Sequence, residues 1–234
     1  MSELFTLRPG VSFNIHPESK PSFTNFRELV HDQVAEMDRF LAETQECKSL
    51  LDAGAAQGVF SLAFAARGGG ALAVEPSIRS TPILEYNIQA NNDLDIGMAS
   101  CALSDISGID TMWHYGGFLY FTPHVKYDNE AIEVYKNTGD ALCKERGFRP
   151  DVIKIDVEGH EVRVLKGLQE TIRRFKPIIF LEVHIREVLL HGDKTVDLDS
   201  YFEDYTIERI SGEKMTSLGD LEEGRLHWFL LKPL

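Results

Sequence analysis

Residues 50–77, LLDAGAAQGVFSLAFAARGGGALAVEPS, place two apolar segments on either side of a glycine turn and a helical segment. The first apolar segment carries Asp52 and the second ends at Glu75, so the pattern predicts strand, turn, helix, strand and acidic residue. A helix that joins two strands in this way makes them parallel neighbours in one sheet. This stretch therefore restricts the chain to an α/β fold whose strand ends carry carboxylates.

Strands and helices continue to alternate along the rest of the chain. We expect strands at 48–53, 71–75, 97–103, 151–156, 177–183, 204–210 and 226–232. We expect helices near 23–44, 58–67, 79–91, 160–175 and 185–191. Two of the strands, DVIKID and PIIFLEV, are almost continuous apolar runs, as parallel strands covered on both faces require. The last two strands have only a polar loop between them, so they pair antiparallel or lie apart. The pattern predicts a doubly wound, mostly parallel sheet of about seven strands with a C-terminal antiparallel hairpin.

The chain length of 234 residues suits one α/β domain with a short appendage. Residues 1–45 read as polar and irregular and then helical, and we interpret them as an N-terminal extension of a domain over 46–234. An aromatic-rich insert at about 109–137 interrupts the alternation. Gly116 and Gly117 within it favour a hairpin turn.

Charge and cysteine content exclude several classes of function. The chain has 24 basic and 37 acidic residues and no basic patch, which argues against nucleic acid as a partner. Cys47, Cys101 and Cys143 lack zinc or CxxC spacing and suit the reduced thiols of an intracellular protein. The N-terminus has no signal-peptide pattern, and the apolar runs are too short to cross a bilayer. We expect a cytoplasmic protein without a membrane partner, and nothing predicts its oligomeric state.

The glycine turn has the spacing Asp-x-Gly-x-x-x-Gly, with Gly54 and Gly58 as its glycines. A dinucleotide fingerprint needs glycines at relative positions one, three and six, and here alanine and valine hold the last two positions. S-adenosylmethionine has no phosphate and needs carboxylates for its ammonium and ribose hydroxyls, which Asp52 and Glu75 are placed to supply. The turn therefore favours S-adenosylmethionine over a nicotinamide cofactor. The alternative is that both glycines only allow close packing of strand and helix.

Charged residues also end the two apolar strands within 151–184. Asp156 and Glu158 follow one strand, and Glu182 and His184 end the other. Because ligands of open α/β sheets bind at the carboxyl ends of strands, Asp156, Glu182 and His184 are candidate catalytic residues. The ordinary pKa of histidine, about 6.5, suits His184 to act as a base, although a structural histidine is the alternative. The same group of side chains suits a divalent metal such as Mg²⁺ or Ca²⁺, which the sequence does not favour.

Four motifs resemble the FkbM family of S-adenosylmethionine-dependent methyltransferases. They are LLDAGAAQGVFSL, AVEPS, CALSDISG and DVIKIDVEGHEVRVLKGL with KPIIFLEVH, and they cover roughly 48–184. The resemblance implies a Rossmann-like, class I methyltransferase fold and O-methylation of a hydroxyl on a small molecule or sugar. The cofactor-binding residues implied by the family pattern are Asp52, Gly54, Ala55, Gly58, Glu75, Ser104 and Asp105, the last two beside the adenine.

The resemblance also implies a strand order in which 151–156 lies between the first strand and 177–183. Lys154, a charge inside an apolar strand, must then be paired, and we expect Glu182 or Asp52 to be its partner. His160 is expected at the exposed start of the helix 160–175, although contact with substrate is an alternative.

The chain departs from the family pattern in three places. Ala56 replaces the asparagine of the family turn, and Gln57 is a candidate substitute for its amide. The family's Leu-Asp-Asp before the fourth strand is reduced to Asp140 in TGDAL. The insert matches no family motif and is expected to flank the acceptor, or to pack on its own domain or a second subunit. Among its aromatic residues, Trp113, His114, Tyr115, Phe118 and Tyr120 offer flat faces suited to a sugar or ring.

Two functions of other classes stay open at this stage. A nicotinamide-dependent oxidoreductase is disfavoured by the glycine spacing. A non-catalytic binding or scaffold protein that keeps the methyltransferase fold is disfavoured by Asp52 and Glu75 and left open by Ala56. The sequence does not identify the acceptor.

Overall fold

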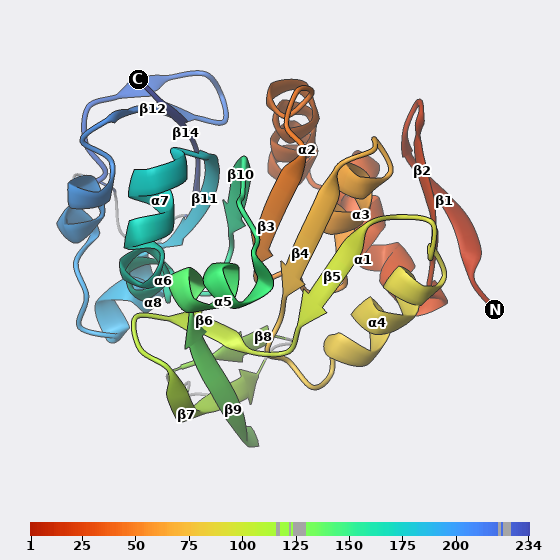
Figure 1. The fold of residues 1–234 in the computed structure, drawn as a ribbon, viewed down its shortest axis with the longest axis horizontal. Helices are drawn as coiled ribbons and strands as arrows, with labels where there is room; N and C mark the ends of the chain where they lie inside the picture. The colour runs from red at the N-terminus through yellow and green to blue at the C-terminus, as the bar shows by residue number, and fades with distance from the viewer. Residues whose placement is uncertain (116–117, 122, 124–129, 220, 222–225) are drawn as a thin grey trace. The chain divides into compact units, whose positions relative to one another are not determined.

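The computed structural model describes residues 1–115, 118–121, 123, 130–219, 221 and 226–234 (Figure 1). The chain divides into two compact units. Unit 1 comprises residues 1–100 and 150–154, and unit 2 comprises residues 101–149 and 155–234.

Unit 1 contains the predicted strand–turn–helix–strand arrangement. Its parallel strands are β3 (Ser49–Ala53), β4 (Gly70–Val74) and β5 (Ile96–Ala99), and its helices α3 (Val59–Ala65) and α4 (Thr81–Gln89) follow β3 and β4. Every residue of α3 is buried, which explains why its sequence, VFSLAFA, is apolar on all sides. The helix packs against β3, β4 and β5. These elements confirm the fold that the opening stretch predicts.

The N-terminal residues correct one expectation, because they are not irregular. They form an antiparallel hairpin of β1 (Glu3–Arg8) and β2 (Val11–Ile15), with Gly10 in the turn at a φ of 81°. Phe5 and Phe13 stack in this hairpin, and both meet Phe23 edge to face. Alternate residues of both strands are buried, so a period-two signal was present but short.

The predicted helix at 23–44 is present as several consecutive pieces. They are α1 (Lys20–Thr24), which begins before the predicted start, the π-helical turn η2 (Asn25–Leu29) and α2 (His31–Glu43), and the 3₁₀ turn η1 (Pro17–Ser19) precedes them. Met37 and Phe40 of α2 are buried.

The hydrogen-bonded strand order of the main sheet is β13-β12-β14-β11-β10-β3-β4-β5. Here β10 is Val152–Ile155 and β11 is Ile178–His184, so β10 lies between β3 and β11 as the family resemblance implies. The C-terminal strands β12 (Tyr205–Arg209) and β14 (Leu226–Pro233) pair antiparallel, which confirms the predicted hairpin. The two-residue strand β13 (Lys214–Met215) was not predicted.

Unit 2 also contains a second sheet of four strands, in the order β6-β9-β7-β8. Its strands are β6 (Ala102–Ser104), β7 (Gly108–Tyr115), β8 (Phe118–Tyr120) and β9 (Glu130–Thr138). The strand predicted at 97–103 is therefore two strands that belong to different sheets. The strands β7 and β8 pair antiparallel, whereas the predicted turn at Gly116 and Gly117 lies outside the described residues. The sheet has its own apolar core of Ala102, Met112, Leu119, Ile132 and Val134.

The helices of unit 2 differ from expectation at two points. Helix α5 (Gly139–Arg146) was missed, although Thr138 caps it by accepting a hydrogen bond from the Ala141 amide. The helix predicted at 160–175 is divided at Leu168 into α6 (Glu161–Gly167) and α7 (Gln169–Phe175). Helix α8 (Ile185–Leu190) and the 3₁₀ segment η3 (Thr195–Tyr201) follow β11. None of the helices in the described ranges is long and apolar enough to cross a membrane.

Candidate functional site

The glycine turn after β3 is held in a left-handed backbone conformation at three positions. The φ angles are 81° at Gly54, 48° at Ala56 and 90° at Gly58. A Cβ at residue 58 would also lie 2.6 Å from Leu84 Cδ1, so Gly58 is required for packing against α4. Asparagine tolerates positive φ better than alanine does. The family asparagine at position 56 therefore suits the backbone, and Ala56 holds the same conformation at a cost.

Both predicted carboxylates of unit 1 organise this turn. Asp52 Oδ2 accepts hydrogen bonds from the amide and the hydroxyl of Ser61, at 3.1 and 2.6 Å. Glu75, directly after β4, accepts from the Ala56 amide at Oε2 and from the Ser77 amide at Oε1, both at 2.8 Å. The two side chains are 2% and 7% exposed. The acidic residue that ends β4 thus fixes the backbone of the turn that follows β3.

These residues fit the requirements of S-adenosylmethionine. A carboxylate offers about four acceptor positions, so the two amide bonds of Glu75 do not by themselves exhaust its capacity to accept ribose hydroxyls. Gly54 has no Cβ, so it adopts the left-handed conformation without strain and a ligand can approach its backbone closely. All the residues that show this fit to the cofactor belong to unit 1.

Ser104 and Asp105, predicted beside the adenine, lie in unit 2 at the end of β6. The Ser104 hydroxyl is fully buried and 2.9 Å from His160 Nε2, and Asp105 accepts from Lys166 Nζ at 3.0 Å. A side chain at Gly167 would collide with the Ser104 carbonyl oxygen, so this glycine allows α6 to approach β6. The packing of α6 therefore sets the position of Ser104.

His160 is buried, contrary to the expectation of an exposed helix start. It is 2% exposed, and its ring stacks on Phe121 with a centroid separation of 3.9 Å. Burial, with the nearby positive charges of His191 and Arg163, lowers the pKa of His160 to about 3. The imidazole is therefore neutral and bonded to Ser104.

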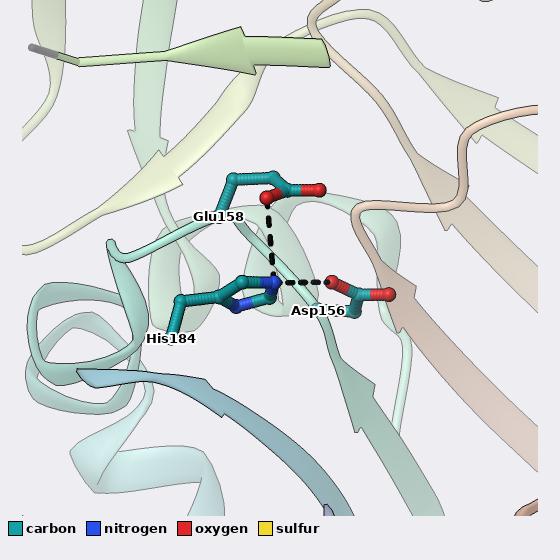
Figure 2. A group of neighbouring side chains, drawn as sticks. All are labelled: Asp156, Glu158 and His184. Atoms are coloured by element: carbon teal, nitrogen blue, oxygen red, sulfur yellow. Dashed lines mark ion pairs between the residues drawn. The ribbon is translucent and has the colours of Figure 1, made fainter. Parts of the chain in front are cut away.

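The charged ends of β10 and β11 converge on His184 (Figure 2). His184 Nε2 lies 3.3 Å from Glu158 Oε2, 3.7 Å from Glu182 Oε1 and 3.9 Å from Asp156 Oδ1. The three residues predicted as catalytic are thus brought together in unit 2, with Glu158 among them. We name Asp156, Glu158, Glu161, Glu182 and His184 the strand-end cluster.

Glu161 is the member of the strand-end cluster to which the sequence analysis assigned no role. Its Oε1 lies 2.8 Å from His184 Nδ1 and also accepts from the Gly159 amide at 3.0 Å. The residue is completely buried. An acidic residue in the first turn of a helix is ordinarily solvated, so only the family motif VEGHE pointed to this position.

The loop between β10 and α6 has an unusual backbone. Glu158 has a φ of 53° and Gly159 a φ of 98°. A side chain at residue 159 would collide with Glu187 of α8. Positive φ at a non-glycine residue costs energy and is often found at functional sites. In this loop it directs the Glu158 side chain toward His184.

The electrostatics of the strand-end cluster set the protonation of His184. Burial lowers its pKa, but the Glu161 hydrogen bond and the charges of Glu161, Asp156 and Glu158 outweigh burial and raise it well above the ordinary value. Burial raises the pKa of Glu158 to about 7, with further raising by Asp156 and Glu161. His184 therefore carries a proton at neutral pH, and the groups available to accept one are carboxylates.

The aromatic insert contacts the strand-end cluster. Tyr120 of β8 hydrogen-bonds the Glu158 carboxylate, an interaction that opposes the rise in the pKa of Glu158. Trp113 is partly exposed and His114 is buried, whereas the side chains of Tyr115 and Phe118 lie outside the described residues.

Lys154 has a partner that the sequence analysis did not consider. Its Nζ lies 3.1 Å from Glu36 Oε1, and the two side chains are 1% and 2% exposed. The ammonium also lies over the ring of Phe60 at 5.2 Å. Helix α2, which carries Glu36, thereby supplies a buried counter-charge to β10.

The cysteines take no part in these sites. Cys101 and Cys143 are buried free thiols, and burial raises the pKa of each to about 11. Thiols with so high a pKa are poor nucleophiles at neutral pH.

Comparison with known proteins places the motifs in a family. A model described as the methyltransferase FkbM domain matches residues 52–208. The structure of methyltransferase FkbM from Methylobacillus flagellatus KT is 17% identical with a TM-score of 0.50, over 79% of this chain and 43% of that one. This chain thus spans less than half the length of that protein. No curated protein matches the chain.

Two other solved structures are similar at lower scores. The SAM-dependent methyltransferase from Agrobacterium tumefaciens is 13% identical with a TM-score of 0.49, over 99% of this chain and 70% of that one. A putative O-methyltransferase from Klebsiella pneumoniae is 12% identical with a TM-score of 0.49, over 87% and 82%.

Proposed function

This chain belongs to the FkbM family of S-adenosylmethionine-dependent methyltransferases, and we propose that it methylates a hydroxyl oxygen of a small molecule or sugar. The observation that supports oxygen as the acceptor atom is the strand-end cluster. An alcohol must lose its proton as its oxygen gains the methyl group, and carboxylates held at strand ends are suited to receive that proton. General-base catalysis of this kind contributes on the order of 10²–10⁴-fold in rate.

In unit 1 the proposed cofactor-binding residues belong to the glycine turn and the carboxylates that organise it, and in unit 2 they lie at the end of β6. Glu75 would accept the ribose hydroxyls, and Asp52 would face the ammonium of the methionine end. When bound, S-adenosylmethionine supplies an electrophilic methyl group on a sulfonium ion. The residues proposed to bind it are Asp52, Gly54, Ala55, Gly58, Glu75, Ser104 and Asp105.

The proposed catalytic residues are Asp156, Glu182 and His184. In the reaction the bond from the acceptor oxygen to the methyl carbon forms while the carbon–sulfur bond breaks, and the hydroxyl proton passes to a carboxylate. Asp156 or Glu182 would take this proton, since His184 already holds one. The imidazole lies within 3.9 Å of an oxygen of Asp156 and of Glu182 and would hold both carboxylates in position. Alignment of the reacting groups supplies much of the rate, because well-oriented reactions gain about 7–11 kcal/mol.

The acceptor is proposed to bind beside the insert, which extends over about 109–137. The support for this is the hydrogen bond of Tyr120 to Glu158, which links β8 to the strand-end cluster. Partly exposed aromatic faces such as that of Trp113 suit the apolar face of a sugar or a ring.

Product analysis tests the proposal. The protein is incubated with S-adenosylmethionine and paired acceptor panels, one of sugars and phenols and one of the corresponding amines. We expect S-adenosylhomocysteine to form together with a product that is one methyl group heavier, and NMR to locate that methyl on oxygen. Methylation confined to amines or to carbon would overturn O-methyl transfer and leave the family assignment intact.

A further inference from the structure

The strand-end cluster has the composition and spacing of a metal site. Asp156, Glu158 and His184 each offer one ligand atom, and these atoms all lie within 4.8 Å of one another. Figure 2 shows both carboxylates reaching the same ring nitrogen of His184 from the loop after β10. Ligands about 2.1 Å from an octahedral cation are about 3 Å apart when adjacent and about 4 Å apart when opposite. The separations of 3.3 and 3.9 Å from Nε2 fall within this range.

The contact of Glu161 with the other imidazole nitrogen, Nδ1, is a second observation that indicates a metal ligand. A metal-binding histidine commonly donates its remaining ring N–H to a carboxylate, which fixes the tautomer and the ring orientation. Glu161 Oε1 lies 2.8 Å from His184 Nδ1, so Nε2 is the nitrogen that faces Asp156 and Glu158. Glu161 is fully buried, and its second oxygen, Oε2, has no hydrogen-bond donor among the described residues. A buried carboxylate with an unpartnered oxygen is strongly unfavourable unless positive charge lies nearby.

The charge balance of the strand-end cluster also favours a bound cation. Four carboxylates, those of Asp156, Glu158, Glu161 and Glu182, have an oxygen within 3.9 Å of the His184 ring nitrogens. Like charges at these distances repel strongly where water is scarce. The cation would take the place of a proton on Nε2 of His184, and its two positive charges would offset two of the carboxylates.

We propose that Asp156, Glu158 and His184 bind one divalent cation, with Glu161 orienting His184 from outside the coordination shell. Two carboxylate oxygens and one imidazole favour an oxygen-preferring ion that accepts a nitrogen ligand, and Mn²⁺ fits this better than a thiolate-preferring ion. Three protein ligands leave positions open for water or for a hydroxyl. A hydroxyl bound there would lose its proton more readily, and Glu182 would remain to receive it. This catalytic role rests on the proposed O-methyl transfer, whereas binding of the ion does not.

Titration with Mn²⁺ tests the site in the full chain. The protein is treated with EDTA and dialysed, and free Mn²⁺ is followed by its electron paramagnetic resonance signal. We expect one Mn²⁺ to bind per chain. Asp156→Asn and His184→Gln should each weaken binding at least tenfold, and Glu161→Gln should weaken it by about 10–100-fold. The matched control is Asp204→Asn, which removes an exposed carboxylate elsewhere in unit 2 and should leave affinity unchanged.

The wild-type protein keeps the test decisive even where a variant fails to fold. Absence of saturable Mn²⁺ binding by the wild type would overturn the proposal, as would unchanged affinity in a folded Asp156→Asn protein. Methyl transfer is assayed on the same EDTA-treated sample with and without Mn²⁺. Binding of Mn²⁺ without O-methylation of any acceptor would retain the metal site and remove the proposed function. O-methylation at full rate by a protein that does not bind Mn²⁺ would retain the proposed function and remove the metal site.

Discussion

Carboxylates are buried in both units of the molecule, and their surroundings differ sharply. In unit 1, Glu75 accepts from two backbone amides and Glu36 faces one ammonium. In unit 2, four carboxylates surround the single imidazole of His184. Hydrogen-bond donors stabilise the charged form of the first kind, whereas crowding destabilises the charged form of the second. The comparison teaches that buried acids hold a backbone where amides bind them, and are suited to take up a proton or a cation where several carboxylates crowd around one imidazole.

The largest expected effect concerns the buried ion pair of Glu36 and Lys154 in unit 1. Glu36→Ala removes the carboxylate that lies 3.1 Å from the buried Lys154 ammonium, and we expect the free energy of unfolding to fall by about 3–5 kcal/mol. The matched double variant Glu36→Met/Lys154→Met replaces both charges by apolar side chains of similar length and should be much less costly. Urea unfolding of both variants measures the difference. An equal loss of unfolding free energy in both variants would mean that the ammonium left without Glu36 is not the cause of the loss in Glu36→Ala.

The next effect concerns turnover at the strand-end cluster. Asp156→Asn keeps the shape of the side chain but removes a carboxylate, and we expect kcat to fall at least about a hundredfold. Asp204→Asn, an exposed carboxylate of the same unit, is the control and should not change kcat. Steady-state assays on an identified acceptor provide the measurement. A kcat near that of the wild type in Asp156→Asn would place the proton transfer elsewhere.

A smaller effect is expected for cofactor binding at the glycine turn. Glu75→Ala removes the acceptor of the Ala56 and Ser77 amides as well as the proposed acceptor of the ribose hydroxyls. We expect the affinity for S-adenosylmethionine to fall by about 1–3 kcal/mol in calorimetric titration. Glu85→Ala, on the exposed side of α4, should bind as the wild type does. NADH should show no saturable binding to the wild type, and micromolar affinity for it would restore the oxidoreductase alternative.

The smallest effect concerns the backbone of the glycine turn. Ala56 is exposed and has a φ of 48°, so Ala56→Gly relieves strain without loss of packing. We expect the free energy of unfolding to rise by about 1 kcal/mol, since a left-handed conformation costs a non-glycine residue roughly 1–2 kcal/mol. Ala55→Gly is the matched control, because Ala55 is buried and its φ is not positive. This substitution should destabilise the protein. Stabilisation by both substitutions would show that strain at residue 56 is not the cause.

Much of unit 1 could be predicted from the sequence because local rules determine it. Apolar runs predict β3, β4 and α3 directly. The glycines at 54 and 58 predict the turn between β3 and α3. The hairpin β1–β2 was missed because each of its strands shows only two or three alternations. Its turn residue, Gly10, carries no signal that distinguishes a hairpin from an irregular start.

The cluster of unit 2 could be predicted only in part. The strand-end positions of Asp156, Glu182 and His184 follow from the strand pattern and the parallel order. The burial of Glu161 and the raised pKa of His184 depend on how α6 packs, which no local pattern encodes. Likewise, Glu36 and Lys154 are far apart in sequence, and nothing near either residue indicates its partner.

The central claim is that the two groups of carboxylates divide the work, with Glu75 holding the cofactor and Asp156 serving the acceptor. Calorimetric titration of S-adenosylmethionine into the wild type, Glu75→Ala and Asp156→Asn tests this division most directly. The account predicts that Asp156→Asn binds the cofactor as the wild type does, while Glu75→Ala binds it roughly 5–150-fold more weakly, the equivalent of about 1–3 kcal/mol. Equal weakening in both variants, or no binding by the wild type, would contradict it.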